Sequence, residues 1–235
     1  MTTVISAKPA EGGVEAVDRA LSLLGCFGQA AETLPLAELA RRSGYHKSTI
    51  LRLSVSLIRH GFLVRQTDGR FRLGPELWHL GALYRAGVQP AFIIRPELQR
   101  LTSETGETAS FYVRDADRRV CLYREEPERS VRHSLSEGAA LPMSGGASAL
   151  VLHAWGDRRD PSLDETRRIG HAVSRGARDP DVAAIAVPVL HTGRLLGALT
   201  LSGPIDRFER VDEAGLLTCL KASADRIAAD LATSG

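Results

Sequence analysis

Residues 35–74, PLAELARRSGYHKSTILRLSVSLIRHGFLVRQTDGRFRLG, contain the pattern that decides the fold of the N-terminal third of this chain. A short helix is predicted from Leu36 to Arg42, and Gly44 suits the left-handed turn that would follow it. A second helix is predicted from Lys47 to Arg59, because its apolar residues recur at helical spacing. These apolar residues are Ile50, Leu53 and Leu57. Two short helices joined by a tight glycine-containing turn are typical of a helix-turn-helix.

A β-hairpin is predicted directly after the second helix. Residues 62–66 are strand-like, Asp68 and Gly69 form a typical tight hairpin turn, and residues 70–73 alternate between polar and apolar. Helix, helix and hairpin together make a winged helix-turn-helix, to which we assign residues 14–75. An earlier helix is predicted from Val14 to Phe27. Its predicted apolar stripe is Val17, Leu21, Leu24, Cys26 and Phe27.

The exposed side of the second helix carries residue types that bind nucleic acid. The N-terminal end of a recognition helix reaches base edges in the major groove, where Lys and Arg pair with guanine or phosphate and hydroxyl groups hold phosphate. The candidate DNA-binding residues are Lys47, Ser48, Thr49 and Arg52 on the helix, and Arg65, Arg70 and Arg72 on the wing. The alternative is that Ser48 and Thr49 only cap the helix and that the arginines are solvated.

The charge distribution agrees with a DNA-binding head. Between residues 14 and 75, nine Lys and Arg face five Asp and Glu, whereas residues 76–235 have a net charge of −2. The composition, 43% hydrophobic and 25% charged, is that of a soluble globular protein. The sequence lacks the ~18 consecutive apolar residues of a membrane helix, and residues 1–13, predicted to be a disordered tail, lack the apolar core of a signal peptide. A cytoplasmic protein without a membrane partner is therefore expected.

Neither the cysteines nor the histidines form a chemical motif. Cys26, Cys121 and Cys219 are odd in number and far apart, so we expect small buried residues and neither disulfides nor a zinc site. A redox-sensing role for Cys121 is the alternative. The histidines lack metal-ligand spacing, and the chain has no P-loop, dinucleotide fingerprint or catalytic triad. We therefore expect no enzyme activity, no cofactor and no metal.

The remaining two thirds predict an α+β unit behind a connector helix. The connector, residues 76–92, has an apolar stripe that suits either a contact between two copies or docking within the chain. The stripe consists of Leu77, Trp78, Leu80, Leu83 and Tyr84. In residues 93–235, helices are predicted to cover a largely antiparallel sheet. The predicted helices span residues 96–105, 144–155 and 211–232, the strands 108–114, 119–124, 131–135, 183–190 and 195–202, and a loop 138–142.

Both parts of the sequence resemble the IclR (isocitrate lyase regulator) family. In the head the resemblance lies in AVDRALSLLGCF at residues 16–27, in residues 46–57 and in the hairpin block that follows. The pieces that resemble the family's effector-binding domain, which is similar to GAF-type sensors, are TGETASFYV, VRHSLSEGAALPMSGGASALVL, GHAVSRG, DVAAIAVPVL and GALTLSGPIDRF. The resemblance covers about nine-tenths of the chain. Ser54 departs from it, because the family usually has an apolar residue there, and residues 156–168 are shorter than the family's segment.

The resemblance implies a regulator that binds operator DNA as a homodimer or homotetramer and responds to a small organic acid. It places the effector pocket at Met143, Ser144, Gly145, Gly146, Ser174, Ala184, Thr200 and Ser202. The residues themselves add that Ser144, Gly145 and Gly146 would open a helix and offer free amides to a carboxylate.

Strand alternation places small and hydroxyl-bearing residues on one face of the last two strands. This face is predicted to carry Ala184, Ala186, Leu196, Ala198, Thr200 and Ser202, with Ile185, Val187 and Val189 opposite. The alternative is an orphan regulator whose C-terminal part only oligomerises, with the hydroxyls in structural roles.

Overall fold

The computed structural model describes residues 13–28, 32–88, 91–128, 135–156, 160–208 and 210–233. The described chain forms two compact units, one up to Tyr84 and one from Arg85 onward. Most of the predicted N-terminal tail and all but Leu135 of the strand predicted at 131–135 lie outside the described residues.

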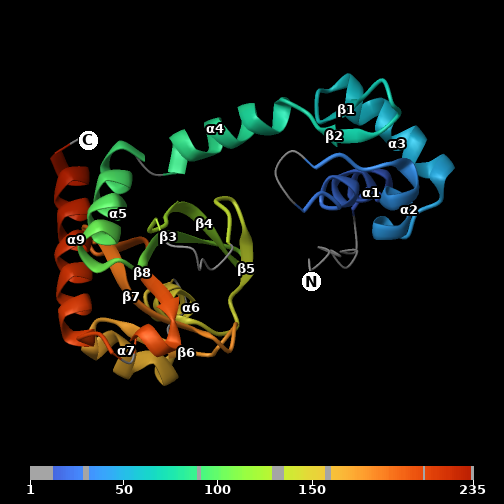
Figure 1. Ribbon diagram of the computed structural model, residues 1–235. Helices are drawn as coiled ribbons and strands as arrows, with labels where there is room; N and C mark the ends of the chain where they lie inside the picture. The colour runs from blue at the N-terminus through green and yellow to red at the C-terminus, as the bar shows by residue number, and fades with distance from the viewer. Residues whose placement is uncertain are drawn as a thin grey trace. The chain divides into compact units, whose positions relative to one another are not determined.

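The N-terminal unit is a winged helix-turn-helix (Figure 1). Its elements are α1 (Glu15–Leu24), α2 (Leu36–Ser43), α3 (Lys47–Arg59), β1 (Leu63–Arg65) and β2 (Phe71–Leu73). Gly44 ends α2 with a φ of 72°, in the left-handed region where a side chain would be strained. Strands β1 and β2 pair antiparallel. The helix-turn-helix and its wing are therefore confirmed, and α3 begins and ends at the predicted residues.

A small apolar core holds this unit together. Leu23, Leu39, Ile50, Leu63 and Phe71 are each no more than 1% exposed. The prediction for the first helix was partly wrong. Leu24, Cys26 and Phe27 pack into or against this core, but Val17 and Leu21 are 53% and 59% exposed. The helix is apolar on more than one side, so spacing alone did not reveal which side meets α2 and α3.

Helix α4 (Glu76–Val88) follows the wing at the predicted connector. Four residues of its apolar stripe are exposed rather than packed within the described part of this chain. They are Trp78, Leu80, Leu83 and Tyr84. Because these side chains are exposed, the apolar stripe of α4 does not pack against the rest of the described N-terminal unit.

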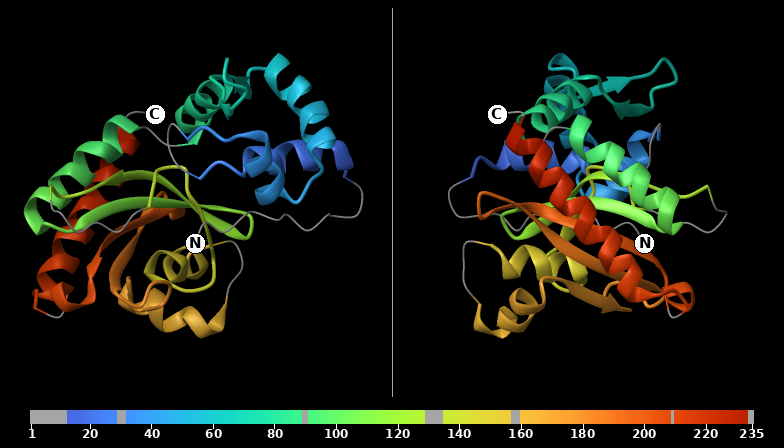
Figure 2. Two further views of the ribbon diagram at one scale, coloured as in Figure 1. Left: turned by 45° about the vertical axis from the view of Figure 1, so that its right-hand side comes forward. Right: turned by 90° about the vertical axis from the view of Figure 1, so that its left-hand side faces the viewer.

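The C-terminal unit is built on a six-stranded antiparallel sheet of order β5-β4-β3-β8-β7-β6. Helices α5 and α9 lie on one face and α6 lies on the other (Figures 1 and 2). The strands are β3 (Thr108–Asp115), β4 (Arg118–Glu125), β5 (Ala140–Pro142), β6 (Ala172–Arg175), β7 (Val182–His191) and β8 (Arg194–Pro204). The helices are α5 (Ala91–Thr105), α6 (Ala147–Ala154), η1 (Pro161–Leu163), α7 (Asp164–Ile169), α8 (Ile205–Phe208) and α9 (Glu213–Thr233).

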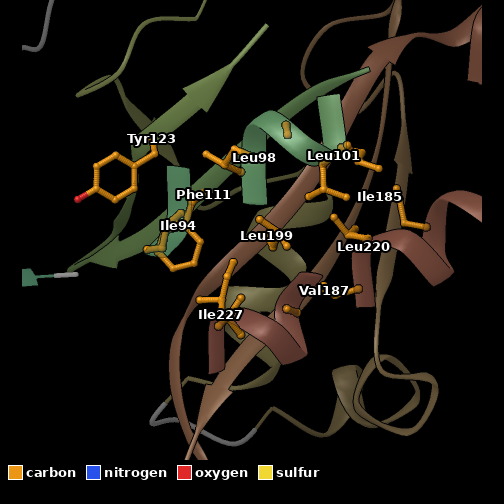
Figure 3. Packing of buried hydrophobic residues seen from close by; sticks show 14 of the residues in the cluster. Ile94, Leu98, Leu101, Phe111, Tyr123, Ile185, Val187, Leu199, Leu220 and Ile227 are labelled. Atoms are coloured by element: carbon orange, nitrogen blue, oxygen red, sulfur yellow. The ribbon is translucent and has the colours of Figure 1, made fainter. Parts of the chain in front are cut away.

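The large core lies between the sheet and the helix pair α5 and α9. Figure 3 shows Ile94, Leu98 and Leu101 of α5 and Leu220 and Ile227 of α9 among its members. The sheet contributes residues from several strands, which include Phe111, Tyr123, Ile185, Val187 and Leu199. The face toward α6 has a smaller core with residues such as Ala186 and Ala198. The side chains on the α6 face are small and leave space beside the sheet, whereas large side chains fill the core between the sheet and helices α5 and α9.

Four local predictions in this unit were wrong. The helix predicted at 96–105 is α5, which begins at Ala91, within the range predicted for the connector. The loop predicted at 138–142 contains the short strand β5, which pairs with β4. Helix α6 begins at Ala147 rather than Ser144, because Gly145 and Gly146 have φ values of 80° and 93°. Leu196 packs with the large core instead of sharing the face of Ala198. The register shift between Val189 and Leu190 breaks the simple alternation of this hairpin.

Candidate functional site: a basic helix face and a polar pocket

The N-terminal end of α3 is open at its surface. His46 precedes the helix, and no side chain of a described residue caps it, so Ser48 and Thr49 do not act as caps here. Lys47, Ser48 and Arg52 are exposed and Thr49 is half-buried. The first amides of the helix and these side chains therefore share one accessible surface.

The arginines of the N-terminal unit differ in what surrounds them. On α2, Arg41 and Arg42 both donate to the carboxylate of Glu38, and these hydrogen bonds lower the pKa of Glu38 to about 2. Within the described residues, Lys47 and Arg52 have no acidic partner in salt-bridge range. The positive charge that remains uncompensated is therefore on α3, not on α2.

The three wing arginines are held loosely. The guanidinium of Arg65 lies 5.6 Å from the centre of the Phe71 ring. Arg70 lies 3.7 Å from a carboxylate oxygen of Asp68 with half of its side chain exposed, and Arg72 donates to the carbonyl of Leu73 at 3.4 Å. None of these contacts is strong enough to hold the side chain away from a phosphate.

A polar cavity lies on the α6 face of the sheet. Its empty space is about 480 Å³, a volume that includes open solvent. Five predicted pocket residues line it, namely Gly146, Ser174, Ala184, Thr200 and Ser202. The other three, Met143, Ser144 and Gly145, do not line it, and Met143 is buried in the small core.

One amide at the start of α6, beside the predicted cradle, already has a partner. The first amide of α6, that of Ala147, donates to the Oγ of Ser174 at 3.0 Å. The carbonyl oxygen of Gly145 accepts a hydrogen bond of 2.7 Å from Nη1 of Arg119. Gly145 of the predicted cradle therefore binds the Arg119 guanidinium through its carbonyl oxygen, while the predicted role of the Ser144–Gly146 amides stays a prediction.

The sequence reasoning missed Arg119, which lines the cavity and is only 3% exposed. Within the described residues, its Nε atom has no hydrogen-bond partner and no carboxylate pairs with its guanidinium. Burial lowers the pKa of its guanidinium, Tyr112 raises it, and the positive charge of Arg178 lowers it again. The signal was the pair Arg118-Arg119: on an alternating strand, one of two consecutive arginines must point inward.

The rest of the cavity wall supplies hydroxyl groups. The Oγ1 atom of Thr200 is buried without a hydrogen-bond partner among the described residues, and Ser202 and Ser148 also line the cavity. Burial raises the pKa of the Tyr112 phenol to about 12, so this group is a neutral donor at physiological pH. The lining thus combines the buried Arg119 cation and several neutral hydroxyls with the charged residues Arg178 and Asp179.

Cys121 lies behind this wall and is fully buried. Burial raises the pKa of its thiol to about 11, which removes the thiolate that redox sensing requires. Cys26 is also buried, whereas Cys219 is partly exposed, and all three are free thiols. Among the residues described, no group of three or more His, Cys, Asp and Glu could hold a metal ion. In the same part of the chain, none of the helices combines the length and the apolar character that crossing a membrane requires.

The winged helix-turn-helix and its open recognition helix define a class, the DNA-binding transcription regulators. The profile of the IclR helix-turn-helix domain matches residues 16–67. The profile of the bacterial transcriptional regulator IclR C-terminal domain matches residues 88–162 and 160–229. The chain belongs to the IclR family. The C-terminal match is in two pieces that meet where the sequence is shortened.

Known relatives extend along most of the chain. The transcriptional repressor IclR of Escherichia coli is 26% identical over 245 residues, which cover 91% of this chain and 89% of the relative. The regulator BhcR of Paracoccus denitrificans is 29% identical over 224 residues, 82% of this chain and 78% of the relative. The crystal structure of an IclR homologue from Microbacterium hydrocarbonoxydans, complexed with 4-hydroxybenzoate, has a TM-score of 0.76 at 22% identity. That comparison covers 93% of this chain and 99% of the homologue, and it concerns the fold alone.

Proposed function

We propose that this regulator binds operator DNA through α3 and its wing, and that a small organic acid in the α6-face cavity changes its operator affinity. The observation that carries the proposal is a buried, carboxylate-free arginine in a polar cavity of a chain that also has a DNA-binding unit. The homologue that binds 4-hydroxybenzoate supports the acid class. Because DNA is the target, we place the protein in the cytoplasm.

In the proposed DNA complex, Arg52 and Lys47 contact bases or phosphates in the major groove, and the hydroxyls of Ser48 and Thr49 hold a phosphate. Arg65, Arg70 and Arg72 contact the backbone or the minor groove. The exposed apolar residues of α1 and α4 support assembly as a homodimer or homotetramer, which would require a pseudo-palindromic operator.

Arginine substitutions test the DNA-binding part. We expect Arg52→Ala to weaken operator binding by about 1–3 kcal/mol and to relax specificity at one base pair. Arg59→Ala, an exposed arginine at the far end of α3, is the control and should have the smaller effect. Arg70→Ala should weaken all sequences alike and reduce the salt dependence. The measurements are titrations against operator and scrambled DNA, with footprinting to count half-sites. Wild-type operator affinity for Arg52→Ala, or protection of one isolated half-site, would contradict this arrangement.

Operator titrations in the presence and absence of carboxylic acids test the sensing part. A ligand changes operator affinity only through its different affinities for the free and DNA-bound states. We expect at least one acid to raise the melting temperature of the protein and to shift operator affinity. If no acid in a broad panel does either, the C-terminal unit only oligomerises and the sensing proposal is wrong.

A further inference from the structure

Two residues that line the cavity each have a buried polar atom without a partner among the described residues. One is Nε of Arg119 on β4, and the other is Oγ1 of Thr200 on β8. Leaving a buried donor or acceptor unpaired costs free energy, so a fold tolerates two of them in one cavity when something else satisfies them. The two atoms therefore mark where a ligand would place its own polar groups.

The strand register separates these two positions. Strand β3 lies between β4 and β8, with Arg119 opposite Arg114 and Thr200 opposite Ser110. Adjacent strands lie about 4.8 Å apart, so the two backbones are separated by about 10 Å across the sheet, with a further offset along it. Tyr112 of the intervening strand also lines the cavity. One ligand would have to extend past this tyrosine to meet both groups.

The surroundings of the two atoms differ in charge. Arg119 holds a permanent positive charge, and the lining also contains Arg178 and Asp179, whose charges are opposite. Around Thr200 the neighbours in the wall are small or neutral, such as Ala184 and Ser202. The cavity is thus positive near Arg119 and neutral near Thr200.

We propose that Arg119 anchors the carboxylate of the effector and that Thr200 binds a hydroxyl or keto oxygen at the other end of the same molecule. This inference rests on the proposed function and narrows it to small carboxylic acids that carry a second oxygen-bearing group. The carboxylate occupies the unpaired Nε side of the guanidinium, while Nη1 keeps its bond to Gly145. Ala184 of β7, the strand on the other side of β8, leaves space beside the second anchor point.

The experiment uses the full chain and a panel of two- to nine-carbon carboxylic acids, benzoate and 4-hydroxybenzoate among them, each with its primary amide. Binding is measured by thermal shift and calorimetry. We expect wild type to bind acids and not their amides, and hydroxy or keto acids more tightly than the unsubstituted parents. Arg119→Met should weaken acid binding about 10- to 100-fold, the range expected for a hydrogen bond to a charged group, and Arg119→Lys should restore part of it. Arg114 lies opposite Arg119 in the strand register but is exposed, so the control variant Arg114→Met should leave acid binding unchanged.

Thr200→Val keeps the side-chain shape and removes the hydroxyl. We expect it to abolish the preference for the substituted acid, about 3- to 10-fold, and to leave the parent acid unaffected. Equal binding of amides, or wild-type acid affinity in Arg119→Met, would overturn the anchor while the sensing function stands. An unchanged preference in Thr200→Val would overturn the second contact. If wild type binds no member of the panel, the proposed function itself fails.

Discussion

Ser54 offers a direct test of how the N-terminal unit is stabilised. It is 2% exposed on α3, and its Oγ atom has no hydrogen-bond partner among the described residues. A buried hydroxyl without a partner costs about 1–3 kcal/mol, whereas a methyl group there would contact the apolar core. We therefore expect Ser54→Ala to stabilise the protein, although the substitution also removes an atom from a packed site.

Ser56 is the matched control for this prediction, because it lies on the same helix and is exposed. Both substitutions gain the same helix propensity, about 0.5 kcal/mol, so their difference isolates the buried hydroxyl. The small void left in Ser54→Ala offsets part of its gain. We therefore expect the free energy of unfolding to rise by about 1–2 kcal/mol more in Ser54→Ala than in Ser56→Ala.

The assay is equilibrium urea unfolding of the full chain followed by circular dichroism. Hydrogen exchange of peptides from α3 assigns the change to the N-terminal unit. If Ser54→Ala is no more stable than Ser56→Ala, the hydroxyl is satisfied in solution and the reasoning is wrong.

Two further predictions concern the C-terminal unit. Iodoacetamide should modify the partly exposed Cys219 in the native protein and leave Cys121 unmodified until unfolding, because burial raises the pKa of the Cys121 thiol to about 11; rapid native labelling of Cys121, read by mass spectrometry, would contradict this. Glu107, which is 1% exposed, binds Arg207 with both carboxylate oxygens, so Glu107→Gln should lower the free energy of unfolding by about 2–3 kcal/mol in urea titrations; an unchanged midpoint would show that the pair contributes little.

Most of the fold was predictable because its signals are local. Gly44 marks the turn between α2 and α3, and Asp68 with Gly69 marks the turn of the wing, so both α2 and α3 were placed within one residue. Each of these features depends on turn chemistry that a few adjacent residues determine. The same holds for the hairpin of β7 and β8, which turns at Thr192 and Gly193.

The features that were missed depend on contacts between distant segments. The carbonyl oxygen of Gly145, just before α6, accepts a hydrogen bond from Arg119, which is 26 residues away. The inward orientation of Arg119 depends on the register of β4 with its neighbours, and β3 itself shifts register between Phe111 and Tyr112. Periodicity within one segment does not reveal such a shift. Five of the eight residues expected in the pocket line the cavity, but the buried charged residue, Arg119, was not among the eight.

Arg119 also allows a test of whether ligand binding and stability oppose each other in this protein. Its guanidinium is buried and makes one hydrogen bond to a described residue, to Gly145, whereas Arg124 on the same strand is buried and bonds Glu126 and Ser110. A buried charge without a counter-charge costs several kcal/mol, and a neutral side chain of similar length removes that cost.

In the absence of ligand, we therefore expect Arg119→Met to be at least as stable as wild type. We expect Arg124→Met to lose about 2 kcal/mol in the free energy of unfolding, because Glu126 and Ser110 lose their partner and Glu126 is partly solvated. Urea titrations of both variants and wild type, without added acid, give the comparison. A loss in Arg119→Met as large as that in Arg124→Met would mean that Arg119 is held for structure through Gly145. Stability without acid binding in Arg119→Met would mean that the fold carries an unpaired charge in order to bind an anion.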